Sequence, residues 1–252
     1  MISLYFDVAK TAGKRAIKAW PVAFSVLIYA AIMAAAMYLF GSMGMIGGFI
    51  MGFIMAGCFS SYLTLLDNTV SGHKSRWADL KSGFGARFWD VISVMFAFWV
   101  LGLASRVLVN AAQEKAPAMQ AIIGLVIAVF FNVVPELLYQ GSTRSFALLM
   151  ESGRFITKNW MSWFPPNLLF AAVALAPQGM LWVDHPGELL LLFNRVFSTS
   201  GPLLLFARVP LWLMPLPLLF LHFVMVYRGV LFKELAHSNP RLRAFREAQR
   251  RD

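Results

Sequence analysis

The chain has 252 residues, of which 59% are hydrophobic and 13% are charged, and its mean hydropathy is +0.67. Because a soluble domain carries about a quarter charged residues, this composition excludes an ordinary soluble domain and predicts an integral membrane protein. The formal net charge is +10, so the positions of the basic residues decide whether they indicate nucleic-acid binding or membrane topology.

The first expected element is an amphipathic helix over residues 1–19. Its apolar side chains recur at helical spacing and its lysines share the opposite face, a pattern typical of a helix that lies on a membrane surface. We predict the first membrane span at about 20–40 and the second at about 44–66. Because only residues 41–43 join them, the two spans are expected to form an antiparallel hairpin.

The same order of elements occurs twice more along the chain. Residues 67–90 and 140–160 are polar segments with apolar side chains at helical spacing, and each precedes two long apolar stretches. The predicted spans in these stretches are 91–109, 121–139, 161–183 and 202–232. The last span is overlong and contains four prolines, which predicts a kink or a break.

The expected fold is therefore all-α: a polytopic membrane protein with six transmembrane helices in three hairpins, each preceded by a cytoplasmic amphipathic surface helix. Residues 1–232 would form a single transmembrane domain, and residues 233–252 a basic cytoplasmic tail. The threefold recurrence is either an architectural repeat or the ordinary appearance of a six-span protein with short outer loops.

The basic residues lie almost entirely on one side of this topology. Of the 22 Lys and Arg residues, only Arg106, Lys115, Arg195 and Arg208 fall in or beside the segments expected on the other side. The positive-inside rule then places both termini in the cytoplasm. Anionic lipid head groups at the cytoplasmic face are the expected partner of so many cations.

A stripe of small residues runs along the second predicted span. It consists of Gly44, Gly48, Gly52, Ala56 and Ser60. Residues four apart share one face of a helix, and in lipid a smooth face lets another helix approach closely, because packing there replaces the hydrophobic effect. We expect the stripe to pack against the preceding helix or against a second copy of the chain or another membrane protein.

A second group of residues comprises ionisable side chains in or beside the predicted spans, where each is costly. The candidates for substrate, ion or lipid contact are Glu136, Arg208, Arg106 and His222. Glu136 is either a proton or cation site or an interfacial carboxylate paired with Arg144 or a lysine. The two arginines either bind an anionic group or extend to the interface. His222 is either a ligand or hydrogen-bonded to a neighbouring helix.

No motif of enzyme or cofactor chemistry is present. The sequence has no HExxH, no GxSxG, no phosphate-binding glycine loop and no dinucleotide fingerprint. The single cysteine, Cys58, is expected to be a small packing residue. We therefore expect no enzyme, no cofactor and no metal site. Nucleic acid is not an expected partner, because no base-reading module accompanies the charge.

Two segments resemble parts of a known group of proteins. PELLYQGSTRSFALLMESGRFITKNW at 135–160 and WADLKSGFGARFWD at 77–90 are similar to segments of uncharacterised bacterial six-span inner-membrane proteins, including the membrane domain fused to some glycerophosphodiester phosphodiesterases. The resemblance implies a bacterial inner-membrane location and an accessory role. It implies no phosphodiesterase activity, because the chain has no such domain.

The expected function is a non-enzymatic membrane component that organises lipid or a membrane partner complex. The alternative is a small transporter or channel in which Glu136 and Arg208 lie in the pathway, because the prolines of the last two spans are typical of discontinuous helices at binding sites.

Overall fold

The computed structural model describes residues 2–74, 76–141, 143, 145–175 and 215–237. These residues form helices joined by turns, with no strand among them. Five helical segments of this part of the chain are long and apolar enough to cross a membrane: Pro21–Phe40, Gly44–Ser71, Phe88–Ala111, Gln113–Gln140 and Pro215–Ala236. Arg208, most of the basic tail and the beginning of the predicted last span lie outside the described residues.

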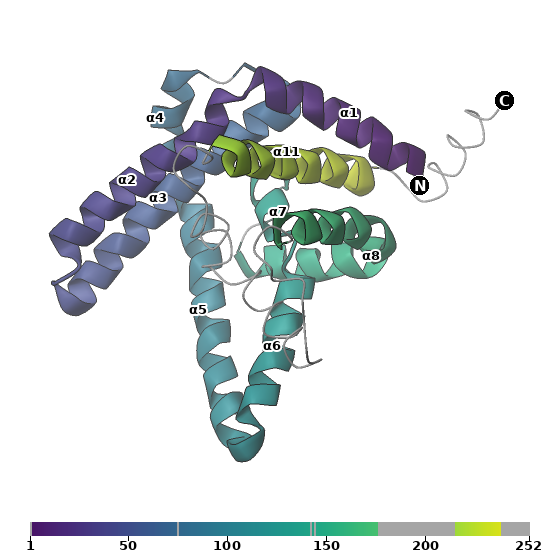
Figure 1. Cartoon of the computed structure of the whole chain (residues 1–252). Helices are drawn as coiled ribbons and strands as arrows, with labels where there is room; N and C mark the ends of the chain where they lie inside the picture. Colours follow the sequence, from purple (N-terminus) through teal and green to yellow (C-terminus); the bar gives the residue numbers. More distant parts are fainter. Residues whose placement is uncertain (1, 75, 142, 144, 176–214, 238–252) are drawn as a thin grey trace.

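The first two apolar helices lie side by side. Helix α1 (Ile2–Lys18) leads through a sharp corner into α2 (Pro21–Phe40), which is joined by residues 41–43 to α3 (Gly44–Ser71) (Figure 1). Helix α3 extends beyond the predicted end at residue 66. It ends before Gly72, whose φ of 82° is a left-handed conformation that glycine adopts without strain.

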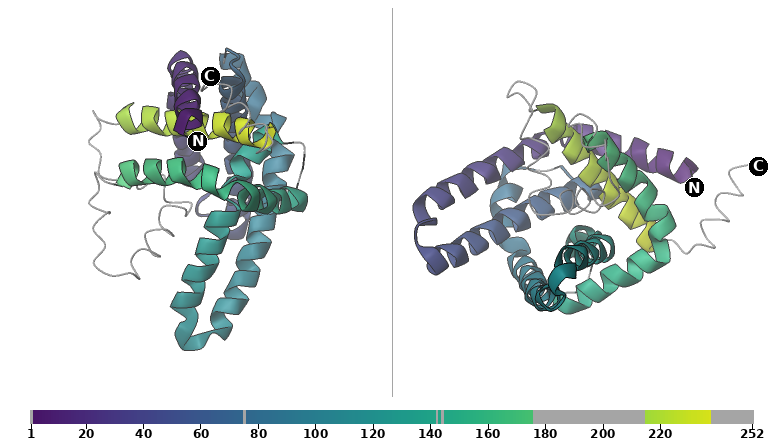
Figure 2. Two further views of the ribbon diagram at one scale, coloured as in Figure 1. Left: turned by 90° about the vertical axis from the view of Figure 1, so that its right-hand side faces the viewer. Right: turned by 60° about the horizontal axis from the view of Figure 1, so that its bottom comes forward.

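A second pair of helices projects away from the rest of the molecule. The chain continues through α4 (Trp77–Ala86), α5 (Phe88–Ala111), the short 3₁₀ turn η1 (Gln113–Lys115) and α6 (Ala116–Phe130). Helices α5 and α6 run side by side, with η1 at their tip (Figure 1, Figure 2). Large apolar side chains such as Trp99 and Val107 are exposed along this pair, as expected of helices surrounded by lipid.

The remaining helices take a different direction. They are α7 (Val134–Gln140), α8 (Ser145–Leu175) and α11 (Pro215–His237). Helices α8 and α11 lie side by side and run across the axis of α5 and α6 (Figure 1, Figure 2). Helix α1 packs against α11. The described helices are therefore not arranged as parallel hairpins around one common axis.

Two predicted boundaries differ from those in the structure. The fourth predicted span, 121–139, is interrupted by a turn at residues 131–133, between α6 and α7. The expected surface helix at 140–160 and the beginning of the fifth span at 161–183 are one continuous helix, α8. Helix α8 is not among the five apolar segments.

Helix α8 continues through Pro165 and Pro166 because its freed carbonyl groups find another donor. Each proline lacks the N–H that would bond the carbonyl four residues earlier, which frees the carbonyls of Met161 and Ser162. The hydroxyl of Tyr5 in α1 lies 3.4 Å and 3.2 Å from these two oxygens and donates to them. Burial raises the pKa of Tyr5, so the hydroxyl keeps the proton that it donates.

The buried core lies where α1, α3, α7, α8 and α11 meet. Its fully buried side chains include Ala12, Leu63, Leu148, Trp163 and Val226. The free halves of α5 and α6 extend beyond this core (Figure 1).

Helix α4 packs on α3 through small and hydroxyl-bearing residues. The hydroxyl of Ser60 donates to the carbonyl of Gly83 at 2.6 Å, and that of Ser61 donates to the carbonyl of Leu80 at 2.7 Å. The hydroxyl of Tyr29 in α2 donates to Ser61 at 2.8 Å. The three helices are therefore tied together at one buried point.

This arrangement divides the predicted stripe of small residues. Ala56 and Ser60 are buried, whereas a Cβ atom at Gly44, Gly48 or Gly52 would meet no neighbouring atom within 4 Å. Within the described residues, the close contact expected between the preceding helix and Gly48 or Gly52 is therefore not made. A contact of this half of the stripe with a second copy or another protein stays a prediction.

Gly83 tests the packing of α4 on α3. A Cβ atom here would lie 3.0 Å from the Cα atom of Ser61, whereas a Cβ atom at Gly85 would have open space. We expect Gly83→Leu to lower the free energy of unfolding in detergent by about 1–3 kcal/mol, the usual cost of overpacking. Gly85→Leu is the control and should not be destabilising, because it exchanges an exposed helical glycine for a better helix former. Equal unfolding midpoints for the two variants would contradict the packing described.

Candidate functional site

The interruption at residues 131–133 is the first part of the candidate site. Pro135 removes one N–H from the helical ladder, and the carbonyl oxygens around it accept from distant side chains. The hydroxyl of Ser152 in α8 donates to the carbonyl of Phe130 at 2.6 Å. Arg228 Nη2 in α11 donates to the carbonyl of Asn132 at 2.6 Å. Two other helices therefore satisfy the backbone that the break exposes.

A buried ion pair joins α7 to α11. Arg228 Nε lies 2.7 Å from Glu136 Oε1, and Nη2 lies 3.1 Å from Oε2, so the pair is bidentate. The Glu136 side chain is 0% exposed and that of Arg228 is 14% exposed. The guanidinium carbon lies 5.2 Å from the centre of the Trp163 ring, a distance typical of a cation–π contact.

Trp163 also binds the interrupted segment. Its Nε1–H donates to Oδ1 of Asn132 at 2.9 Å, and its side chain is fully buried. One residue of the break, Asn132, is thus held by α8 through its side chain and by α11 through its carbonyl group. This fixes the direction of the turn between α6 and α7.

A second arginine holds the other end of α7. Arg87, which directly precedes α5, donates to the carbonyls of Leu138 and Tyr139, both at 2.8 Å. The carboxylate of Asp67 in α3 accepts from the same guanidinium at 2.8 Å. The last carbonyls of a helix carry partial negative charge, so a cation here also complements the dipole of α7.

These four charged residues, Asp67, Arg87, Glu136 and Arg228, form what we call the α7 clamp. Both oxygens of Glu136 accept charge-assisted hydrogen bonds, and both arginines also bind backbone carbonyls. The α7 clamp therefore stabilises a broken helix in apolar surroundings, where water cannot supply the missing hydrogen bonds.

The structure places the predicted candidates in different environments. Glu136 pairs with Arg228 of α11, and the expected partner Arg144 lies outside the described residues. Arg106 is exposed on α5 and takes no part in the α7 clamp. His222 is buried on α11, and neither of its ring nitrogens has a hydrogen-bond partner among the described residues.

The sequence prediction missed Arg228, Arg87 and Asp67. Arg228 lies inside the last predicted span, 202–232, and Asp67 and Arg87 lie in the polar segment 67–90, none of which is among the predicted candidates. The sequence does contain a signal for Arg228, because a buried carboxylate such as that of Glu136 requires a cation at the same depth in the membrane. Glu136 and Arg228 both lie near the cytoplasmic ends of predicted spans, which makes them natural partners.

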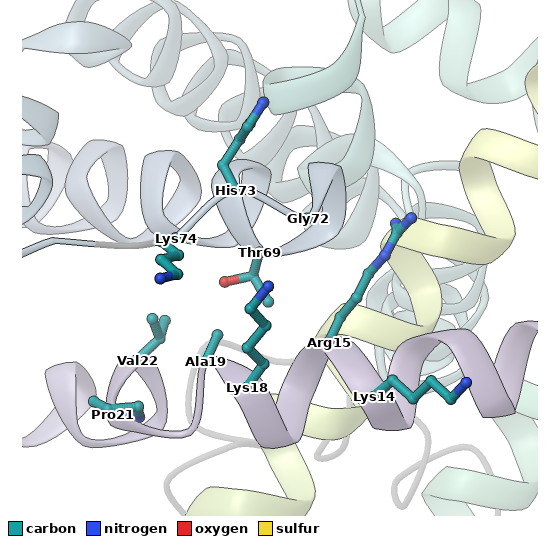
Figure 3. Close-up of a pocket in the computed structure, with 10 residues that line it drawn as sticks. All are labelled: Lys14, Arg15, Lys18, Ala19, Pro21, Val22, Thr69, Gly72, His73 and Lys74. Atoms are coloured by element: carbon teal, nitrogen blue, oxygen red, sulfur yellow. The ribbon is translucent and has the colours of Figure 1, made fainter.

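The second part of the candidate site is a hollow of about 480 Å³ at the corner between α1 and α2, beside the end of α3. Its lining residues are Lys14, Arg15, Lys18, Ala19, Pro21, Val22, Thr69, Gly72, His73 and Lys74. Figure 3 shows Lys18 and Lys74 extending from opposite sides into the space near Thr69. We call this cavity the basic hollow.

Arg15 is fixed at one edge of the basic hollow. Its Nη1 donates to the carbonyl of Val70, in the last turn of α3. Lys14 and His73 extend away from the centre (Figure 3). Among the described residues that line the hollow, basic side chains are present and acidic ones are not, so its field favours an anion.

The chain matches no family model, no curated protein and no solved structure. Among the described residues, no group of three or more His, Cys, Asp or Glu side chains is placed to hold a metal ion. The functional interpretation therefore depends on the α7 clamp, the basic hollow and the apolar helices around them.

The buried pair of the α7 clamp can be tested by a double-mutant cycle. Removing one partner of a buried ion pair costs about 3–5 kcal/mol, because it leaves an uncompensated charge. We expect Glu136→Gln and Arg228→Met each to lower the free energy of unfolding substantially, and the double variant to lose less than the sum of the two. Chemical unfolding in detergent measures all four proteins. Additive losses would contradict direct pairing of the two side chains.

Proposed function

We propose that the chain is a non-enzymatic, multi-pass protein of the bacterial inner membrane that organises anionic lipid or a membrane partner complex at its cytoplasmic face. In this proposal the six predicted spans cross the membrane as three hairpins and both termini lie in the cytoplasm. Because α8 and α11 run across α5 and α6, at least one of these two pairs would be tilted away from the membrane normal.

The observation that carries this proposal is the surface of α1. One stripe of the helix is buried in the core and consists of Val8, Ala12 and Ala16. A second apolar stripe faces outward, and its residues Ile2, Phe6 and Ile17 are 72%, 73% and 77% exposed. A third stripe beside it carries the exposed Lys10, Lys14 and Lys18. A helix with an open apolar stripe next to lysines fits the boundary between acyl chains and anionic head groups.

The α7 clamp supports a structural interpretation of Glu136. A carboxylate that acts as a proton or ion site must exchange its partner during each cycle. Glu136 is instead held by a bidentate contact and has no exposed surface. The most conspicuous intramembrane charge is thus explained by the need to hold α7, which favours a non-transporting role.

Lipid retention tests the proposed function. We expect native mass spectrometry of the protein released from mixed micelles to show enrichment of anionic phosphatidylglycerol over zwitterionic phosphatidylcholine by roughly tenfold or more, since each basic residue near the surface contributes about 1 kcal/mol. Raising the ionic strength should reduce the enrichment. A protein that retains neither anionic lipid nor a partner, yet moves a solute across a vesicle membrane, would overturn the proposal.

A small transporter or channel is the second candidate, and the observation that favours it is the location of Glu136 and Arg228 in two apolar helices. Solute flux in liposomes that disappears in Glu136→Gln or Arg208→Ala would support this candidate. Because Glu136→Gln also removes a structural contact, flux is compared at equal amounts of folded protein, with Arg106→Gln as the control.

A further inference from the structure

We infer that the basic hollow binds the phosphate group of an anionic lipid. This inference rests on the proposed function for the position of the hollow at the membrane surface, but it adds a defined site, its residues and its ligand chemistry. The lysine stripe of α1 alone predicts a diffuse attraction to any negative surface. The basic hollow predicts that one phosphate group is bound at a defined position.

The cations of the basic hollow come from two separate segments. Lys18 belongs to the last turn of α1, and Lys74 follows the end of α3. Their side chains extend toward one another across the hollow, with Thr69 on the wall beside them (Figure 3). Two ammonium groups that approach one small space repel each other, and a bound anion removes that repulsion.

Arg15 adds a third cation whose position is fixed. Its contact with the Val70 carbonyl holds the guanidinium beside α3. The Thr69 hydroxyl already donates to the carbonyl of Leu65 at 2.9 Å. The donors to a phosphate are therefore Lys18 and Lys74, while Arg15 extends away from them and adds positive charge at the edge of the hollow (Figure 3).

The apolar part of the wall places the ligand at the level of lipid head groups. Ala19, Pro21 and Val22 line the hollow at the corner where the first apolar helix begins. A phosphate held by the cations would therefore lie just above the start of a segment able to cross a membrane. The phosphate of a lipid lies at this level of the bilayer, and its acyl chains would extend along α2.

The size of the hollow fits a head group and not a whole lipid. A volume of about 480 Å³ lies in the lower part of the range of small-ligand sites, about 300–1,000 Å³. The acyl chains would remain outside, against exposed apolar side chains of α2 such as Leu27. The same cations would also accept a soluble phosphate, so the experiment must separate these two sources.

The test compares two charge-matched variants of the full chain in mild detergent. The hollow variant is Lys18→Gln with Lys74→Gln. The control variant is Lys81→Gln with Lys158→Gln, which removes the same charge from exposed lysines that neither line the hollow nor belong to the lysine stripe of α1. Arg15 is left unchanged because its contact with Val70 is structural. Unfolding midpoints of both variants verify that the fold is retained.

Native mass spectrometry then counts tightly held molecules of phosphatidic acid, phosphatidylglycerol or phosphatidylcholine per chain. We expect the wild type and the control variant to hold one anionic lipid, and the hollow variant to hold it roughly tenfold more weakly. Inorganic phosphate at millimolar concentration is added in a second arm. If inorganic phosphate displaces the lipid only weakly, the phosphate group that the hollow binds is that of the lipid head group. If phosphate alone binds and depends on Lys18 and Lys74, the site is a phosphate site for a soluble ligand.

The outcomes also separate the inference from the proposed function. Anionic lipid held equally by the hollow and control variants overturns the basic hollow as the site, while the proposed function stands. A wild-type protein without bound anionic lipid that still binds inorganic phosphate through Lys18 and Lys74 supports the phosphate site and contradicts the lipid role. Equal binding of every probe by all three proteins overturns the inference.

Discussion

The bidentate contact between Glu136 and Arg228 is the interaction on which the remaining structure depends. It joins two segments that are 92 residues apart in the sequence, and it lies where the charge cannot be solvated by water. Burying either group alone costs several kcal/mol, so the two helices are held in one register. The same guanidinium binds the carbonyl of Asn132 and stacks near Trp163. The pair thus contributes to the turn after α6 and to the docking of α11, together with Ser152, Trp163 and the contacts of α11 with α1.

A common rule governs the irregular backbone of this molecule. At several points in the described helices where a backbone carbonyl lacks its usual donor, a side chain from a distant segment supplies one. Ser152 and Arg228 do so at the break before α7, Arg87 at its end, and Tyr5 at the paired prolines of α8. In water each exposed carbonyl would be solvated at little cost. In hydrocarbon no water is present to solvate the carbonyl, so each side chain that donates to it has a large effect on the fold.

The sequence allowed the local structure to be predicted much better than the long-range contacts. Apolar length, periodicity and the short link at 41–43 predicted the bounds of α1, α2, α3 and α5 within about five residues, because these signals are local. The fourth predicted span overlaps only the part of α6 from residue 121 onward and continues past its end. The direction of α8 and α11 was not predictable, because it follows from contacts between distant residues. The stripe at Gly48 and Gly52 was assigned to helix packing from spacing alone, although an open stripe has the same spacing as a buried one. Glu136 was identified as unusual, but its partner required the tertiary structure.

The position of α1 has a consequence for biosynthesis. A ribosome makes this helix before the other described helices, yet the elements against which it packs include α11 and the prolines of α8, which are made late. Until α11 is made, the contacts of α1 with the described helices are limited to those with early elements such as α3. Its outward apolar stripe and its lysines can hold it at the bilayer surface during this interval. The arrival of α11 then lets α1 dock, and the hydroxyl of Tyr5 completes α8. The earliest of the described helices would thus be among the last to dock fully, and in the proposed function the membrane surface is its temporary binding partner.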